Sequence, residues 1–173
     1  MSKKVKIVLD ADVIIHFFKG EMLTLLPTIF GEYDYVVLTY VYEELRQADL
    51  RNQLDRQIQF LGNIRVLEFD PKGEMKYEYA MLRQQGRGKG ESACMAYCKY
   101  EHDVVGSSNL RDIKEYCEEN QIVYLTTCDF LWYAWQRGKM TIEEAEAFLD
   151  LVRQKGSKLP DVDIRTYMPN AKL

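Results

Sequence analysis

The chain has 173 residues, of which 47% are hydrophobic and 29% are charged, and its formal net charge is −4. These values are typical of a globular domain with a substantial core, and they argue against a protein that grips nucleic acid through a broad basic surface. They permit a nuclease whose acidic site binds a cation. No apolar run reaches the roughly 18 residues needed to span a bilayer, and residues 1–10 do not form a signal peptide. We therefore expect a cytoplasmic protein without a membrane partner.

Apolar, β-rich runs alternate along the chain with segments of helical composition. The expected strands cover residues 5–9, 35–39, 64–69, 103–105 and 122–125. This alternation is typical of parallel strands joined by crossover helices. It predicts an α/β fold of three layers, with a central, mostly parallel five-stranded sheet between two layers of helices.

The helical segments follow from the spacing of apolar residues and from breakers. We expect helices over residues 12–30 with a break at 19–20, 41–61 as one or two helices, 75–85, 91–100, 110–120, 128–137 and 141–155. Gly138 is a plausible stop, and residues 141–144 (TIEE) form a capping-box pattern. We expect one domain over residues 1–158 and leave the structure of the tail, residues 159–173, open.

Some residues with reactive side chains are better explained by packing than by chemistry. The four cysteines contain no Cys-x-x-Cys pair and lie at positions 94, 98, 117 and 128, so we expect them to be reduced and packed. His16 lies among aliphatic and aromatic residues, which favours a packed histidine over a catalytic one. The aromatic residues at 130–135 are likewise expected to pack in the core or in a dimer.

Carboxylates follow the expected strands or open the expected helices. Asp10 and Asp12 end the first strand, Glu44 follows the second, and Glu91 opens a helix after a glycine-rich turn. Each could simply complement a helix dipole. However, the carboxyl ends of parallel strands share one edge of a sheet, which would gather these acids at a common site. Close acids repel one another unless a divalent cation, which prefers oxygen ligands, joins them.

Three segments resemble the motifs of the PIN-domain family of nucleases, some of whose members are toxins of the VapC type. Residues 9–15 (LDADVII) resemble its opening motif, residues 41–45 (VYEEL) its second, and residues 88–96 (GKGESACMA) its third. The resemblance covers about residues 5–155 and implies a PIN-like fold. It places Asp10, Glu44 and Glu91 as ligands of Mg²⁺ or Mn²⁺, and Asp12 where a small polar residue often stands.

The fourth motif departs from the family pattern. Residues 105–112 read VGSSNLRD, so that Asn109 takes the position where the family commonly has an aspartate. An amide oxygen can coordinate Mg²⁺ but brings no charge, which should weaken metal binding. Asp112 and Asp129 are candidate replacement acids, although each lies in the first turn of an expected helix, where capping or dipole complementarity is an adequate explanation.

The activity implied by the resemblance is endoribonuclease action, with an RNA substrate and a metal-activated water as the nucleophile. In this interpretation Asp10, Glu44, Glu91 and Asn109 form the catalytic set. Ser107 and Ser108 would bind phosphate or hold a water, unless they serve only in turn formation. Arg87 and Lys89, on the glycine-rich turn, would position phosphate, unless they are simply solvated. An antitoxin protein and a second copy of the chain are the implied protein partners.

Other interpretations remain open. The departure at Asn109 permits a degenerate domain that binds RNA or a partner protein without cleaving. The Asp-x-Asp pair also resembles the start of a haloacid-dehalogenase-type phosphatase, with Asp10 as nucleophile, but the later motifs of that family are not evident. A Rossmann-type nucleotide-binding protein is disfavoured because the turn after the first strand contains no glycine.

Overall fold

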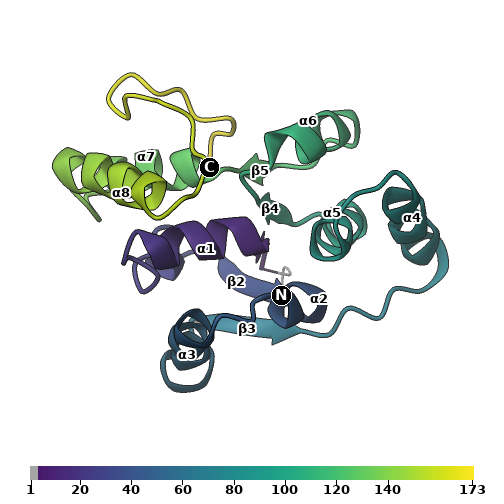
Figure 1. Cartoon of the computed structure of the whole chain (residues 1–173). Coiled ribbons are helices and arrows are strands. Elements are labelled where there is room, and N and C mark those ends of the chain that lie inside the picture. The colour runs from purple at the N-terminus through teal and green to yellow at the C-terminus, as the bar shows by residue number, and fades with distance from the viewer. Residues whose placement is uncertain (1–3) are drawn as a thin grey trace.

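The computed structural model describes residues 4–173, and these form a central sheet covered by helices on both faces (Figure 1). The strands are β1 (Lys6–Leu9), β2 (Asp34–Leu38), β3 (Ile64–Leu67), β4 (Val104–Gly106) and β5 (Tyr124–Leu125). Their spatial order is β3-β2-β1-β4-β5, and every pairing is parallel. The predicted α/β fold and its five strands are confirmed.

The sheet is built around β1. Its residues Ile7, Val8 and Leu9 are fully buried, which is the pattern of a strand covered on both faces. The chain adds β2 and β3 on one side of β1 and then crosses over to add β4 and β5 on the other. The order of the strands thus reverses at β1, and the carboxyl end of β1 lies at the position where open α/β sheets form a crevice.

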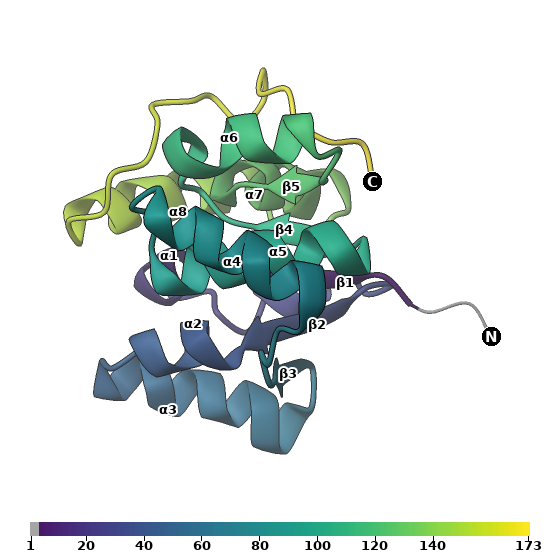
Figure 2. The same ribbon diagram turned by 90° about the vertical axis from the view of Figure 1, so that its right-hand side faces the viewer.

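Helices cover the sheet in two layers. The α-helices are α1 (Ala11–Lys19), α2 (Thr39–Glu44), α3 (Ala48–Arg56), α4 (Gly73–Gln84), α5 (Lys89–Glu101), α6 (Leu110–Glu119), α7 (Thr127–Gln136) and α8 (Ile142–Gln154). Figure 1 shows α1, α3, α7 and α8 on one side of the sheet and α4, α5 and α6 on the other, and Figure 2 shows the layers from the side of α4. A π-helical turn (Gln57–Leu61) continues α3.

The segment after α1 differs from the expected helix. The predicted break at Gly20 is confirmed, and beyond it the chain forms only a short 3₁₀ turn, Leu26–Thr28, with Pro27 in its first turn. A Cβ added at Gly20 would lie 2.2 Å from a ring carbon of Phe148, so only glycine lets α8 approach the end of α1 this closely. The predicted capping box at Thr141 and Glu144 is confirmed.

The residues assigned to packing are in the core. The four cysteines are free and buried, as expected. Phe130 packs edge-on against Phe17 and Phe30, while Tyr133 stacks at an angle on Phe30. Within residues 4–173, no helix is both long and apolar enough to cross a membrane.

Candidate functional site

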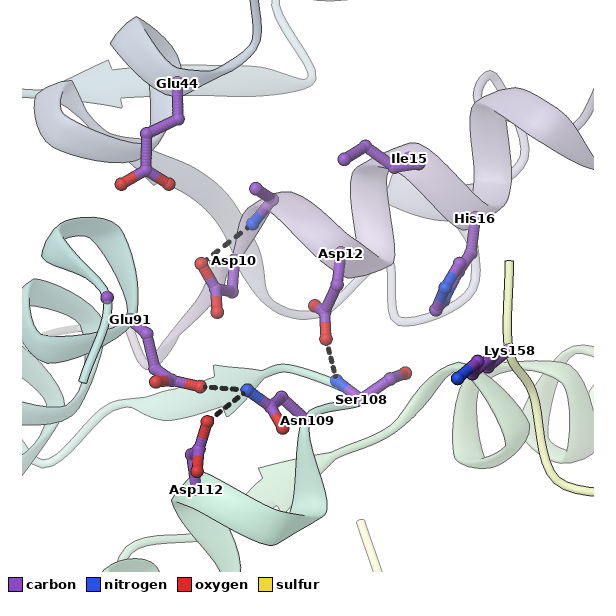
Figure 3. Close-up of a pocket in the computed structure, with 12 residues that line it drawn as sticks. Asp10, Asp12, Ile15, His16, Glu44, Glu91, Ser108, Asn109, Asp112 and Lys158 are labelled. Atoms are coloured by element: carbon purple, nitrogen blue, oxygen red, sulfur yellow. Dashed lines mark hydrogen bonds between the residues drawn. The ribbon is translucent and has the colours of Figure 1, made fainter. Parts of the chain in front are cut away.

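A pocket of about 520 Å³ opens at the carboxyl end of β1 (Figure 3). Its lining comes from the segments after β1 and β4, the end of α2, the start of α5 and the segment after α8. The residues that line it are Asp10, Ala11, Asp12, Ile15, His16, Glu44, Gly88, Glu91, Ser108, Asn109, Asp112 and Lys158. The structure therefore brings together the acids that the sequence places at strand and helix ends.

Asp10 and Asp12 lie on the first turn after β1. Asp10 is 7% exposed and is the N-cap of α1, where its Oδ1 accepts a hydrogen bond of 2.8 Å from the backbone N–H of Ala11. Asp12 Oδ2 accepts one of 2.8 Å from the backbone N–H of Ser108. The Ser107 hydroxyl donates weakly to both carboxylates, at 3.4 Å each. The loop after β4 thus orients both acids.

The pKa values of these two acids are raised by burial, and that of Asp10 also by the neighbouring carboxylates. Burial raises the pKa of Asp10 well above its usual range, and repulsion from Asp12, Glu91 and Glu44 raises it further. Burial also raises the pKa of Asp12, while hydrogen bonds from Ser108 and Val13 oppose that rise. Asp10 is therefore an acid whose charge is poorly tolerated unless a cation lies beside it.

Glu44 reaches the pocket from the last residue of α2, and it is held by the start of α5. Its Oε1 accepts a hydrogen bond of 2.8 Å from the backbone N–H of Gly90. This contact joins two residues that are 46 positions apart in the chain. Within residues 4–173, no hydrogen bond or ion pair engages the second oxygen, Oε2, and Glu44 lines the pocket.

Glu91, Asn109 and Asp112 form a small cluster on the opposite wall (Figure 3). The amide nitrogen of Asn109 donates to Glu91 Oε1 at 2.8 Å and to Asp112 Oδ2 at 2.7 Å. Burial, followed by repulsion from Asp112, raises the pKa of Glu91 to about 7. Asp112 lies in the first turn of α6, where it complements the helix dipole as considered above, but it does not cap the helix: the N-cap is Asn109, which makes no side-chain capping hydrogen bond. Asp112 instead faces the pocket.

The acids of the pocket have no cationic side chain bound to them among the residues that the structure describes. Among residues 4–173, no lysine or arginine forms an ion pair with Asp10, Asp12, Glu44, Glu91 or Asp112. The donors are carboxylate and amide oxygens, which suit Mg²⁺ or Mn²⁺. The donor chemistry and the charge therefore fit a divalent ion. In the described part of the chain, no three acidic, histidine or cysteine side chains stand close enough together to form a ready-made metal cluster.

Of the two uses considered for Asp129, the structure shows the one at the start of a helix and not the one as an acid of the pocket. It is fully buried and does not line the pocket; with Thr126 it forms the capping box that begins α7. Its carboxylate also accepts hydrogen bonds from the Tyr167 hydroxyl and from the backbone and side-chain N–H groups of Asn170, at 2.8–2.9 Å. Asp129 thus anchors the C-terminal tail, and Ile164 of the tail is fully buried.

Arg87 and Lys89 lie beside the pocket and not in its lining. Arg87 contacts Gln85 and Met95, and it is close enough to lower the pKa of Glu91 slightly against the effect of burial. Lys89 lies over the ring of Tyr40 at 4.0 Å and pairs loosely with Glu43 at 3.6 Å. A phosphate role for either residue stays a prediction.

Two lining residues have no signal in the sequence motifs. His16 is 7% exposed, and its Nδ1 lies 2.8 Å from the hydroxyl of Thr127, so it is packed as expected but also borders the pocket. Lys158 comes from the segment after α8, far from every motif in the sequence. Only the folding of that segment back against α1 brings Lys158 to the pocket, so periodicity and spacing could not have identified it.

The sequence matches no protein-family model and no curated protein. Among solved structures, the chain is similar to FitAcB from Neisseria gonorrhoeae, with 17% identity and a TM-score of 0.45 over 68% of this chain and 95% of that one. It is also similar to FitAB bound to an IR36 DNA fragment, with 16% identity and a TM-score of 0.46 over 70% of this chain and 94% of the other.

Proposed function

We propose that the chain is a PIN-type, metal-dependent endoribonuclease that hydrolyses phosphodiester bonds of RNA. One observation carries the proposal: acidic side chains from four separate segments of the described chain line one pocket with no lysine or arginine paired to them. Such an arrangement opposes folding unless a cation is bound, so its natural explanation is a function that needs one. The motifs that resemble the PIN family supply the same residues.

In this proposal Asp10, Glu44 and Glu91 hold Mg²⁺ or Mn²⁺. When bound, the ion would lower the pKa of a water and neutralise the charge that grows on the phosphate. Glu44 and Glu91 must rotate toward Asp10 to share one ion. Glu44 is exposed at the end of α2, whereas Glu91 is 7% exposed and would exchange its hydrogen bond with Asn109 for the ion.

The other residues of the site orient these ligands. The Ser107 hydroxyl and the Ser108 backbone N–H hold the two aspartates in place, as groups around a metal site commonly do. Asn109 places a neutral amide between Glu91 and Asp112, which keeps two carboxylates close together without an added charge.

The experiment combines metal binding with cleavage. Calorimetry should show that Mn²⁺ binds the wild-type chain and binds Asp10→Asn at least tenfold more weakly, because a charged ligand is lost. Labelled single-stranded RNA should be cleaved in Mg²⁺ or Mn²⁺, and Asp10→Asn should slow cleavage by roughly a hundredfold or more. Lys76→Gln, on the exposed face of α4, is the control variant. Cleavage that persists in EDTA would contradict the proposal.

A second candidate is a domain that binds RNA or a partner protein without cleaving it. The observation in its favour is Asn109, whose amide nitrogen is turned toward Glu91 and Asp112 where the resembling family commonly has a fourth acid. Such a binder should hold RNA equally well in EDTA and in Mn²⁺, with no cleavage in either. The same two assays therefore decide between the candidates.

The proposal extends to a toxin role in the cytoplasm, with an antitoxin protein as partner, because some members of the resembling family have that role. Expression of the wild-type chain should then arrest growth, and Asp10→Asn should not. Unimpaired growth on expression of an active nuclease would remove the toxin role and leave the nuclease. Sedimentation of the purified chain tests the expected homodimer.

A further inference from the structure

The pocket has a second end that differs in charge from the acidic end. Lys158 and His16 border this end, next to Ser108 (Figure 3). Of the charged residues that line the pocket within residues 4–173, Lys158 is the only one that is positive. No ion pair joins Lys158 to any of the described residues. The pocket is therefore polarised along its length.

The segment that carries Lys158 is held firmly against α1 and α8. Lys19 donates from its Nζ to the Ser157 hydroxyl at 2.8 Å, and the Ser157 backbone N–H bonds to the carbonyl of Val152. On the other side of Lys158, Arg153 donates to the carbonyl of Pro160 at 2.7 Å. The segment is thus fixed at Ser157 and at Pro160, on either side of Lys158, while Lys158 itself is exposed at the pocket.

His16 contributes a donor whose direction follows from a chain of hydrogen bonds. The backbone N–H of Thr127 donates to Ser108 Oγ at 2.8 Å, and the two hydroxyls of Ser108 and Thr127 are 2.7 Å apart. When the Ser108 hydroxyl donates to the Thr127 hydroxyl and Thr127 donates to His16 Nδ1, both hydroxyls accept one hydrogen bond and donate one. In the opposite direction, the hydrogen of Ser108 would have no partner in this network, which favours the first arrangement. A neutral imidazole that accepts at Nδ1 carries its hydrogen on Nε2.

Nε2 of His16 is the unpartnered atom of this arrangement. It makes no hydrogen bond with any described residue, although the side chain is more than nine-tenths buried and borders the pocket. Burial lowers the pKa of His16 to about 4, so the ring is neutral at neutral pH and Nε2–H is a donor without charge. An N–H donor that borders the pocket without a partner among the described residues is open to an acceptor group of a ligand.

We infer that the end of the pocket bordered by His16 and Lys158 is a phosphate subsite, which binds a backbone phosphate of the RNA next to the one that is cleaved. An ammonium group and an N–H donor that converge on one space match an anionic oxygen acceptor. The acids at the other end repel a phosphate that no metal ion neutralises, so the neighbouring phosphate is favoured at the end bordered by Lys158. The inference rests on the proposed nuclease function.

The test measures binding of a labelled ten-nucleotide single-stranded RNA by fluorescence anisotropy in Ca²⁺, together with cleavage in Mn²⁺. Lys158→Gln should weaken binding roughly tenfold, the size of one charge-assisted hydrogen bond. It should also lower the slope of log affinity against log salt by about 0.7, the value for one phosphate contact on a single strand. Lys158→Arg should restore both, and Lys76→Gln should change neither.

The variant His16→Asn tests the uncharged N–H donor of His16 independently of the positive charge of Lys158. The asparagine side chain can keep a contact with Thr127 but cannot reach the place of Nε2, so binding should weaken about threefold to tenfold. The salt slope should stay that of the wild-type chain, because no charge is removed. If this variant does not fold, as thermal unfolding would show, the lysine variants decide alone.

A scan of RNAs that each carry one neutral methylphosphonate linkage locates the phosphate. At one linkage next to the cleaved one, the modification should cancel the effect of Lys158→Gln, since each change removes the same contact. Mn²⁺ affinity of Lys158→Gln, measured by calorimetry, should equal or exceed that of the wild-type chain, because a nearby positive charge is lost.

The possible outcomes distinguish failure of the phosphate subsite from failure of the proposed nuclease function. If the wild-type chain cleaves RNA and Lys158→Gln behaves like Lys76→Gln in affinity and salt slope, the subsite is wrong and the nuclease stands. If the wild-type chain neither binds nor cleaves RNA, the proposed function fails and the subsite fails with it.

Discussion

Glu44 and Gly90 are fitted to each other: the carboxylate of Glu44 accepts the backbone N–H of Gly90 at 2.8 Å, and a Cβ at Gly90 would lie 2.7 Å from Glu44 Oε2. The same Cβ would lie 2.9 Å from a methyl carbon of Val41, which is fully buried and cannot move aside easily. Glycine at this position therefore allows α2 to pack closely against α5. This close packing fixes the position of the Glu44 carboxylate in the pocket.

Gly90→Ala should displace the Glu44 carboxylate. We expect Mn²⁺ affinity to fall roughly tenfold to a hundredfold, as when a group that supports a metal ligand is lost. Overpacking against Val41 should lower the free energy of unfolding by about 1–3 kcal/mol. Gly88→Ala is the matched control, because a Cβ there would meet nothing nearer than Glu91 Cβ at 3.9 Å. Calorimetric titration of both variants checks the prediction, and equal affinities would contradict it.

Asn109→Asp should strengthen metal binding and weaken the metal-free fold. The substitution replaces an amide that bridges Glu91 and Asp112 by a third carboxylate, so repulsion rises when no cation is present. With an added negative ligand, Mn²⁺ affinity should rise roughly tenfold. Thermal unfolding in EDTA and in Mn²⁺ measures both effects. Asn109→Ala, which removes the bridge without adding charge, should not gain affinity.

Glu91 should make the metal-free protein less stable as the pH rises. Its pKa in the folded state is about 7, above the usual 4.5, because it is buried and lies near Asp112. The folded state then binds more protons than the unfolded state between these values, so the contribution of Glu91 to stability falls from about pH 4.5 to about pH 7 and is constant above.

The measurement for Glu91 compares urea unfolding of the wild-type chain and Glu91→Gln in EDTA across this range. The difference between the two should grow in favour of the variant up to about pH 7. Saturating Mn²⁺ should abolish the trend, because a bound cation favours the charged carboxylate. A difference that is independent of pH would show that Glu91 has an ordinary pKa.

Asp129→Ala should loosen the C-terminal tail as well as the start of α7. The side chain is fully buried and accepts hydrogen bonds from Thr126, Tyr167 and Asn170, so its loss should cost about 3 kcal/mol or more. Glu144→Ala removes the acid of the other capping box, at an exposed position, and should cost only about 1 kcal/mol. Urea unfolding measures the two costs.

Limited trypsin digestion tests the role of Asp129 in the tail. Each variant is digested at the urea concentration that gives both the same free energy of unfolding. Cleavage after Arg165, which follows the buried Ile164, should then be faster in Asp129→Ala than in Glu144→Ala, because the tail opens locally when its anchor is lost. Equal cleavage in the two variants would mean that the tail is held by other contacts, such as those of Tyr133 with Ala171 and Leu173.

Local sequence patterns predicted the helices and strands well, because the formation of each element depends mainly on residues close together in the chain. The apolar run at β1, the capping box at Thr141 and the break at Gly20 are signals of this kind. The acids were found for a related reason: an acid after a parallel strand lies at the same edge as the others whatever the details of packing.

The same patterns could not separate alternative uses of one residue. Asp129 and Glu144 both complete capping boxes, yet only Asp129 also binds the tail, a contact that spans 41 residues at Asn170. His16 was expected to be packed, and its ring is indeed buried, but its contact with Thr127 spans 111 residues and turns its other nitrogen toward the pocket.

The amino-acid sequence by itself determined the layered fold and the acidic edge of the sheet, because hydrophobic periodicity and strand polarity are local properties of the chain. Tertiary structure alone decided the polarity of the pocket. Lys158 borders the acidic cavity because Lys19 holds Ser157 and Arg153 holds Pro160, and Asn109 separates two carboxylates because α5 and α6 begin side by side. Such contacts depend on distances between remote segments, which become defined only when the core is packed.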